Sequence, residues 1–455
     1  MKTIFLIALG IYLLIFLIIG ILDLKKVRTF ADYGVAGKTQ NSFAVTFTLL
    51  ATVIGASTTI GITDTVYQIG FPGIWWLLFG ALGLIMQSFV LSEKVRSTGA
   101  DTLPHLAGIT VGRAAEVLIS CIIVISWVGV IAGQLVAMNG LITFALGRSS
   151  KLIFIVVSLI ILIYTLVGGQ MSVVKTDKVQ LIIILLGTLI CCFYLYIIRG
   201  DASSSITENI ELLNSNYRPI NLFTQFFVIG GVFFLGPDIM SRNFISKDEK
   251  TARRSAFVAG LVLAGFSLVI TFIGMWVKFN VLPDELGDSK ALMYVIGLLP
   301  KPVAVLMTFG LLSAILSSTD TCLINASAIF VKDILKKEDI KLVRIAVGVI
   351  GGISIALAVL GRGDIMSLLS GAYSIYTPGV IFPLLIGILS YKKKMLRLKV
   401  WILGPILGGA FGIAGTYFAD ALLSLGLSSG IINNLSLIGM FLSLVISLLS
   451  VEWTQ

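Results

Sequence analysis

The chain has 455 residues, of which 57% are apolar and 12% are charged. Soluble domains carry a charge on about 25% of their residues, so this composition excludes an ordinary soluble enzyme and a disordered protein. About 20 apolar residues cross the ~30 Å hydrocarbon core of a bilayer, and the chain holds enough of them for about a dozen crossings. The net charge of +10 does not indicate a nucleic-acid partner, because the basic residues lie in short connectors between apolar runs.

In chain order, apolar runs separated by charged or Gly/Pro connectors predict thirteen membrane-spanning segments. All are expected to be helices, because an open sheet cannot satisfy its backbone hydrogen bonds in lipid. The predicted spans are 3–23, 43–68, 73–93, 117–145, 152–169, 177–198, 220–241, 254–279, 302–333, 342–361, 365–390, 399–421 and 432–451.

The first run is predicted to be a retained helix rather than a signal peptide. Its apolar stretch is long, no small-residue cleavage site follows, and Lys25, Lys26 and Arg28 come directly after it. Six connectors on one side, among them 242–254 and 392–399, hold 24 of the 33 Lys and Arg residues. The positive-inside rule therefore predicts a multi-pass protein of the cell's inner (plasma) membrane, with its N-terminus outside and its C-terminus cytoplasmic.

Two of the spans contain residues that interrupt a helix. Small and hydroxyl residues cluster from Ala51 to Gly61 in the second span, a pattern that also suits simple helix–helix contact. In the seventh span, Pro237 removes a backbone donor after Gly236. Interrupted helices in secondary transporters offer carbonyls and helix ends to ions and substrates.

Each interruption opens a block of five spans, 43–198 and 220–390, and the second block starts on the opposite side of the membrane from the first. This arrangement is an inverted-topology repeat. We therefore predict an all-α polytopic membrane protein with about 13 transmembrane helices and a five-plus-five inverted repeat. Residues 1–24 form one extra N-terminal helix, and residues 399–451 form two extra C-terminal helices.

The ninth span places several oxygen-bearing side chains at mid-membrane. An acid at a helix centre costs roughly 2.5–3.5 kcal/mol on insertion scales, so Asp320 indicates a functional site. Ser317, Ser318, Asp320 and Thr321 offer the hard oxygen ligands that suit Na⁺. Asp177 stands near the predicted start of the sixth span, where a helix-capping role is an equal alternative.

At these residues the sequence resembles the sodium:solute symporter family, which includes bacterial proline, sialic-acid and sugar symporters. The resemblance covers nearly the whole chain, and the order and spacing of its motifs carry it. The family has thirteen helices and a five-plus-five inverted repeat. The matching segments are 31–37, 51–61, Gly168–Gly169 with Thr176, Asp177 and Gln180, 237–242 and 314–321.

The resemblance implies a sodium ion between the broken second span and the ninth span. Some family members hold another sodium at the positions of Asp177, Asp320 and Thr321. Asp320 replaces a serine of some of those members, so a second sodium ion and a proton both stay open here. The implied ligands of the first sodium are the carbonyls of Ala51, Ile54 and Ala314 and the hydroxyls of Ser317 and Ser318.

The resemblance also implies a solute site next to the sodium. Ser57 and Thr58 replace the acid and amide of sugar symporters, and the fourth span lacks the arginine of sialic-acid symporters. A small amino acid or carboxylate is therefore favoured as the solute. The implied solute contacts are Val53, Gly55, Ser57, Thr58, Gln87, Gln134, Phe233 and Pro237.

Together these features predict a sodium-coupled symporter that imports a small organic solute by alternating access. The alternatives are a proton-coupled transporter of the same fold, a sugar or other solute, and a membrane receptor without transport. An intramembrane enzyme is disfavoured, because the chain has one histidine and no nucleophile–base pair is evident. The expected partners are the solute, sodium and the lipid bilayer, and the oligomeric state stays open. The basic run Lys392–Lys399 suits a topology signal and a contact with anionic lipid.

Overall fold

The computed structural model describes residues 2–24, 27–198, 209–287, 289–360 and 364–452. Lys25, Lys26 and position 361, the last residue of one predicted span, lie outside these ranges. The secondary structure assigned to the described residues consists of helices, turns and isolated bridges, so the predicted all-α class is confirmed. Large apolar side chains such as Ile7, Leu152 and Leu449 are exposed on the outer helices, as a lipid-facing surface requires.

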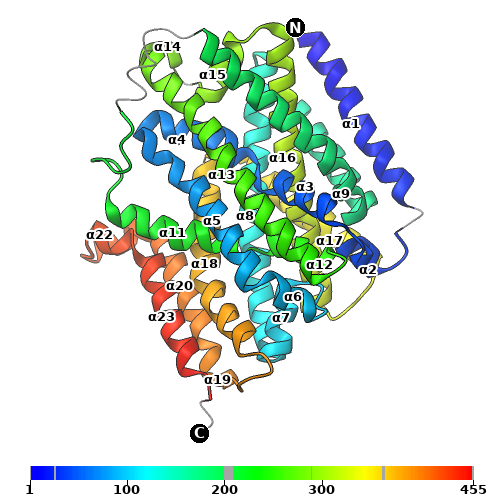
Figure 1. Cartoon of the computed structure of the whole chain (residues 1–455), viewed down its shortest axis with the longest axis vertical. Coiled ribbons are helices and arrows are strands. Elements are labelled where there is room, and N and C mark those ends of the chain that lie inside the picture. The colour runs from blue at the N-terminus through cyan, green and yellow to red at the C-terminus, as the bar shows by residue number, and fades with distance from the viewer. Residues whose placement is uncertain (1, 25–26, 199–208, 288, 361–363, 453–455) are drawn as a thin grey trace.

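The first half of the chain contains six long helices and several short ones (Figure 1). They are α1 (Lys2–Leu24), α2 (Phe30–Val35), η1 (Ala36–Lys38), α3 (Ser42–Val53), η2 (Ser57–Gly61), α4 (Ile62–Ile69), η3 (Phe71–Ile74), α5 (Trp75–Val90), α6 (Ser92–Ser97), α7 (Leu103–Thr110), α8 (Arg113–Leu146), α9 (Lys151–Ile197) and α11 (Pro219–Leu235).

The second half continues with helices of similar length. They are α12 (Pro237–Ile245), α13 (Glu249–Asn280), α14 (Pro283–Leu286), α15 (Ala291–Leu298), α16 (Lys301–Ile329), η4 (Phe330–Ile334), α17 (Ile340–Val359), α18 (Ile365–Ser390), α19 (Leu398–Trp401), α20 (Leu403–Tyr417), α21 (Ala419–Ser424), α22 (Ser429–Ile432) and α23 (Leu435–Leu449).

Among the described residues, ten helices are long and apolar enough to cross a membrane, and the bent pair Ser42–Val53 and Ser57–Ile69 makes up to eleven. The predicted number of thirteen needs two more crossings. One would come from α9, which contains two predicted spans, and the other from the shorter apolar helix α23. The number thirteen, the repeat boundaries and the orientation of the termini stay predictions.

Both predicted interruptions are present. The first divides α3 from η2 and α4, whose axes differ by 59°. It follows from Ile54, whose ψ of 77° is not helical, and η2 then forms a π-helical turn. The second divides α11 from α12 at Gly236, which is extended, and Pro237 occupies the first turn of α12, where its missing N–H is tolerated.

The connector predicted between the spans 152–169 and 177–198 is a sharp turn at its start in the structure. The two helices within α9 meet at Gly169, whose φ of 57° and ψ of −165° are accessible almost only to glycine. A Cβ atom at Gly169 would lie 2.7 Å from the ring of Tyr33. Tyr33 in turn donates a hydrogen bond to the carbonyl of Thr165, at 3.1 Å. The turn therefore occurs where glycine permits it, and Lys175 and Lys178 lie within a helix.

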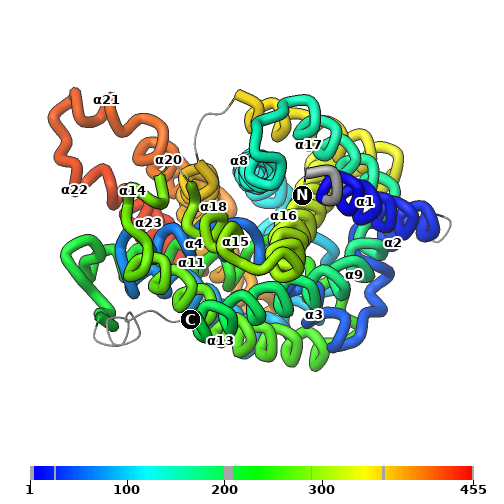
Figure 2. Tube along the Cα trace, turned by 90° about the horizontal axis from the view of Figure 1, so that it is seen from above, coloured from blue at the N-terminus to red at the C-terminus, as the bar shows by residue number. Residues whose placement is uncertain are grey.

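The helix α16 forms the centre of the molecule, and every residue from 307 to 329 on it is buried. Seen from above, α16 is surrounded by other helices, whereas α1 and the α20–α22 region lie at opposite edges (Figure 2). On α1, the Tyr12 hydroxyl bonds to Ser313 of α16 at 2.6 Å, and Asp23 pairs with Lys175 of α9. The central position of α16 places its serines beside the first interruption.

We predict that Gly169→Ala lowers the free energy of unfolding by about 1–3 kcal/mol, because alanine would be strained at this φ and ψ. Gly352→Ala is the matched control, because nothing lies within 4 Å of the added Cβ atom. Denaturant titration of the protein in detergent would measure both changes. Equal stabilities of the two variants would contradict the role given to Gly169.

Candidate functional site

The interruption after α3 frees backbone groups that neighbouring side chains satisfy. The Gly55 N–H donates to the Thr58 hydroxyl at 2.8 Å, and the Ala56 N–H donates to the Gln134 side-chain oxygen at 3.1 Å. A buried backbone group without a partner is costly in a membrane, so these contacts make the interruption possible.

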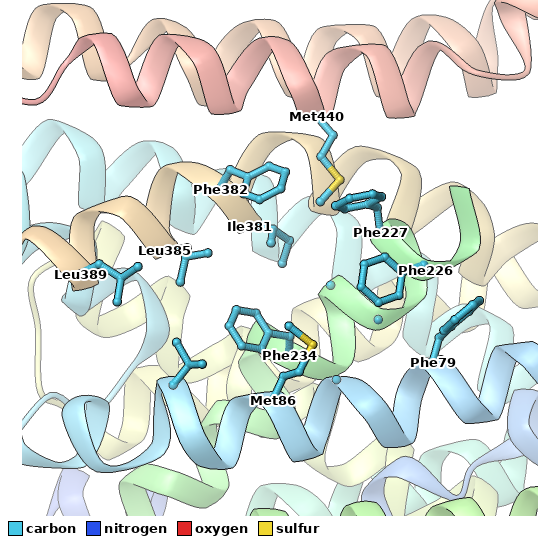
Figure 3. Close-up of a pocket in the computed structure, with 14 residues that line it drawn as sticks. Phe79, Met86, Phe226, Phe227, Phe234, Ile381, Phe382, Leu385, Leu389 and Met440 are labelled. Carbon is cyan, nitrogen blue, oxygen red and sulfur yellow. The ribbon is translucent and has the colours of Figure 1, made fainter. Parts of the chain in front are cut away.

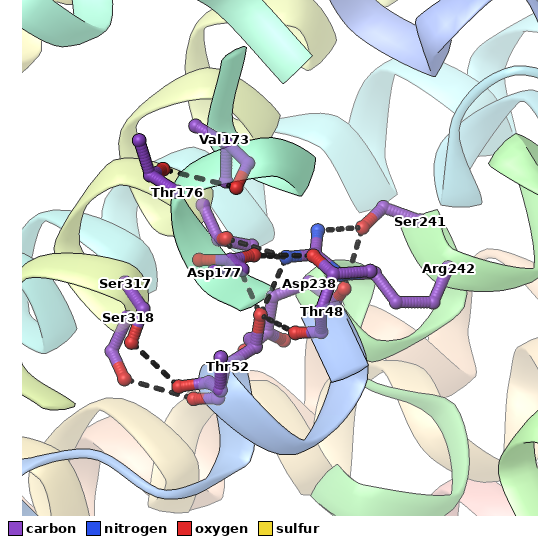
Figure 4. Close-up of polar contacts among 12 residues, drawn as sticks. Thr48, Thr52, Val173, Thr176, Asp177, Asp238, Ser241, Arg242, Ser317 and Ser318 are labelled. Atoms are coloured by element: carbon purple, nitrogen blue, oxygen red, sulfur yellow. Dashed lines mark hydrogen bonds and ion pairs between the residues drawn. The ribbon is translucent and has the colours of Figure 1, made fainter. Parts of the chain in front are cut away.

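Two serines of α16 bind the carbonyls at the end of α3 (Figure 4). The Ser317 hydroxyl donates to the Ala51 carbonyl at 2.6 Å, and the Ser318 hydroxyl donates to the Thr52 carbonyl at 2.8 Å. A Cβ atom at Gly55 would lie 2.6 Å from the Ser318 hydroxyl oxygen. Glycine at position 55 therefore permits the close approach of α16 to the interrupted helix.

The five predicted sodium ligands differ in how directly the structure joins them. Ala51 and Ser317 are hydrogen-bonded to each other, and the Ala314 carbonyl accepts a second, 3.2 Å bond from Ser317. Ser318 instead donates to the carbonyl of Thr52, which is not one of the five predicted ligands. The fifth predicted ligand, Ile54, is fully buried at the interruption. Two hydroxyl and three carbonyl oxygens thus take part in two hydrogen-bonded groups, one around each serine, and all of these residues are buried.

A buried arginine, Arg242 of α12, lies beside these groups (Figure 4). Its guanidinium donates to the hydroxyls of Thr52 and Thr321, the latter at 2.7 Å, and lies 3.4 Å from a carboxylate oxygen of Asp177. Thr48 also donates to Asp177. Arg242 therefore connects both interrupted helices to α9 and α16. The positive-inside count had placed this residue in a connector, and that interpretation was wrong.

The three residues predicted for a second ion or proton do not share one partner. Asp177 and Thr321 both contact Arg242, whereas Asp320 accepts a 2.6 Å hydrogen bond from Thr165. The other carboxylate oxygen of Asp320 is buried without a hydrogen-bond partner in the described part of the chain.

The capping interpretation of Asp177 is wrong. Its helix starts after Gly169, so Asp177 lies two turns inside it and is fully buried. Its side chain contacts Thr48 and Arg242 instead.

A cavity of about 30 Å³ lies beside the interruption of α3. Six of the eight predicted solute contacts line it, together with residues that the sequence did not single out as solute contacts. The predicted ones are Val53, Gly55, Ser57, Thr58, Gln134 and Phe233, and the others are Thr52, Trp76, Val130, Val232, Asp238, Ile239, Ser318, Cys322 and Tyr373.

The two remaining predicted contacts do not line this cavity. Gln87 donates a 3.2 Å hydrogen bond to the Phe234 carbonyl and so supports the interrupted helix α11. Pro237 begins α12, directly before Asp238, which does line the cavity. One oxygen of Asp238 is buried and lacks a hydrogen-bond partner among the described residues. A sequence signal could have pointed to Asp238 and Arg242 as functional residues. These two charged residues are four positions apart and closely follow the helix-breaking Pro237.

Comparison with known proteins agrees with this architecture. The family model for the sodium:solute symporter family matches residues 33–397. The chain belongs to the sodium:solute symporter family. A curated relative, the sodium/pantothenate symporter of Haemophilus influenzae, is 25% identical over 322 residues. That match covers 67% of this chain and 66% of the relative, so it spans just under two thirds of the relative's length.

Two solved structures share the fold. A substrate-bound, outward-open Na⁺-coupled sialic acid symporter superposes with a TM-score of 0.82 at 18% identity, over 99% of each chain. A closed nucleobase-cation-symport-1 family transporter with bromovinylhydantoin bound has a TM-score of 0.60 at 14% identity, over 92% of this chain and 94% of its own. The predicted all-α polytopic fold is confirmed. As a member of this family, the chain is a multi-pass membrane transporter and not an enzyme.

We predict that Arg242→Met lowers the free energy of unfolding by about 3–5 kcal/mol, because it leaves Asp177 buried without its cation. The double variant Arg242→Met/Asp177→Asn removes both charges and should recover at least half of this loss. Denaturant titration in detergent would measure the three proteins. If the double variant is no more stable than Arg242→Met, the two side chains do not act as a pair.

Proposed function

We propose that this transporter imports a small solute with a cationic amino group, such as an amino acid, together with Na⁺ by alternating access. The observation that carries the sodium part is the pair of serine hydroxyls bonded to carbonyls of the interrupted α3. Hydroxyl and carbonyl oxygens are hard ligands, and interrupted helices are where secondary transporters bind their coupling ions.

Sodium binding at this place would exchange hydrogen bonds for ion contacts. When the hydroxyl protons of Ser317 and Ser318 rotate away, the hydroxyl and carbonyl oxygens can all face one cation. The proposed ligands are the carbonyls of Ala51, Ile54 and Ala314 with the hydroxyls of Ser317 and Ser318. Thr52, whose carbonyl already accepts the Ser318 hydrogen bond, is an additional candidate.

We further propose one coupling sodium ion. Arg242 already supplies the positive charge between Asp177 and Thr321, where a second ion would have to compete with a guanidinium. Inward movement of one Na⁺ releases about 2.3 kcal/mol at −100 mV. A tenfold sodium gradient adds about 1.4 kcal/mol. The sum of ~3.7 kcal/mol supports a solute gradient of several hundredfold.

Proton coupling is the second candidate, and one observation favours it. Asp320 is fully buried, and one of its carboxylate oxygens has no hydrogen-bond partner among the described residues. A carboxyl group in such surroundings can carry a proton in place of a metal ion. Uptake that follows a pH step and ignores sodium would select this alternative.

The solute class is proposed from the charge of the cavity. Asp238 lies in the first turn of α12, where the helix dipole favours an anion, and it lines the cavity. One of its oxygens has no hydrogen-bond partner in the part of the chain that the structure describes. An ammonium group would satisfy this oxygen, whereas a carboxylate without an amino group would be repelled. At about 30 Å³ the cavity holds about two water molecules, so Trp76 and Phe233 must move to admit a solute.

We predict that Ser317→Ala/Ser318→Ala abolishes sodium binding, because two ligand oxygens are lost. Binding of ²²Na⁺ to the purified protein measures this without knowledge of the solute. Each lost hydrogen bond should also lower the free energy of unfolding by about 1–3 kcal/mol, and circular dichroism checks that the helices persist. Thr319→Ala is the matched control, because the Thr319 hydroxyl bonds to the Ile315 carbonyl of its own helix at 2.7 Å. Unchanged ²²Na⁺ binding in the double variant would refute the site.

We predict that Asp238→Asn removes discrimination between amino acids and their deaminated analogues. A charge-assisted hydrogen bond contributes about 1.5–3 kcal/mol, so amino-acid affinity should fall about 10–100-fold. Displacement assays with a panel of matched pairs would measure this, and ²²Na⁺ binding should persist. Wild-type protein that prefers the deaminated members would exclude the proposed solute class and leave sodium coupling intact.

A further inference from the structure

A second, wholly apolar cavity of about 210 Å³ lies away from the proposed solute site (Figure 3). It is bounded by α5, α11, α18 and α23, and its walls include Phe79, Met86, Phe227, Phe382, Leu385 and Met440. We call this cavity the apolar groove. An apolar cavity of about 150 Å³ is already large enough to bind benzene, so the groove can hold a hydrocarbon ligand.

The groove opens toward the lipid. Met86 and Leu389, which line it on opposite walls, are 40% and 39% exposed although both belong to membrane-spanning helices. A side chain exposed at this depth faces hydrocarbon and not water. A hydrocarbon chain of the bilayer can therefore enter sideways without crossing a polar region.

One end of the groove is marked by positive charge on both walls. Val90, the last residue of α5, lines the groove, and the exposed Lys94 follows four residues later. On the other wall, Leu389 lines the groove near the end of α18, and the exposed Lys392 and Lys393 follow it. Lys94, Lys392 and Lys393 follow the helix ends, three or four residues after a groove-lining position. Four residues span at most about 14 Å even when extended, so these lysines lie near the apolar walls.

We propose that the apolar groove binds an acyl chain of an anionic phospholipid, whose phosphate contacts Lys94, Lys392 and Lys393. The connectors that carry these lysines are those predicted to face the cytoplasm, and the cytoplasmic leaflet attracts basic segments through its anionic lipids.

The bound chain would touch the interrupted helix α11. On α11, Phe233 lines the solute cavity, and its neighbour Phe234 lines the apolar groove. Gly230 and Gly231 of the same helix also line the groove. The lipid would therefore support one face of the interrupted helix while the other face contacts the solute.

The test compares two lipids with identical acyl chains on the delipidated, full-length protein. Dioleoyl-phosphatidylglycerol is anionic and dioleoyl-phosphatidylcholine is zwitterionic. We expect native mass spectrometry to retain one phosphatidylglycerol per chain, and phosphatidylglycerol to raise the melting temperature more than phosphatidylcholine does. Equal retention and equal stabilisation by the two lipids would overturn the proposed headgroup contact.

Matched variants locate the site. Lys94→Gln/Lys393→Gln should weaken phosphatidylglycerol binding about tenfold or more, whereas Lys250→Gln/Lys341→Gln, at exposed lysines elsewhere, should not. Leu389→Trp and Met86→Trp each fill the groove from its rim and should abolish the retained lipid. Leu189→Trp, on the exposed face of α9, is their control.

Two results would overturn the proposal. The first is wild-type lipid retention in both groove-filling variants. The second is a change of oligomeric state in those variants, measured by light scattering, because it would make the groove an interface between copies of this chain.

Discussion

The structure depends on the hydrogen bonds between α16 and the interrupted end of α3. In a membrane, a helix can stop at mid-depth only if other groups bind the carbonyls and N–H groups that it leaves behind. Ser317 and Ser318 bind the carbonyls, and Gln134 binds an N–H group. This requirement explains why α16 is buried along most of its length and why glycine occupies position 55.

The two interruptions are also connected to each other. Arg242 lies one and a half turns after the second interruption, and it donates to Thr52 at the first. Through Asp177 and Thr321 the same guanidinium reaches α9 and α16. The two interrupted helices therefore meet in one small region, and it is there that we propose the ion and the solute bind.

Residue type and order were enough to predict the fold and the two interruptions, and the family resemblance implied that Ser317 lies beside Ala51. Those features depend on local chemistry: proline, glycine and clustered hydroxyls have few other uses at mid-membrane. Charged residues were harder to place, because charge alone does not reveal a buried partner. Arg242 was counted in a connector and Asp177 was weighed as a cap, since their contact joins residues 65 positions apart. The prediction of Gln87 as a solute contact did not match the cavity for a related reason. Its partner is a backbone carbonyl of α11, and no sequence pattern indicates such a partner.

The guanidinium of Arg242 has a consequence for the empty transporter. A carrier must reorient without cargo in every cycle, and an unbalanced charge would then feel the electric field across the bilayer. Because the Arg242 guanidinium belongs to the same chain as Asp177, the proposed cycle would keep this carboxylate paired whether or not cargo is bound. The membrane potential would then act mainly on the binding and release of the proposed coupling sodium ion. Reorientation of the empty carrier would move less net charge across the membrane.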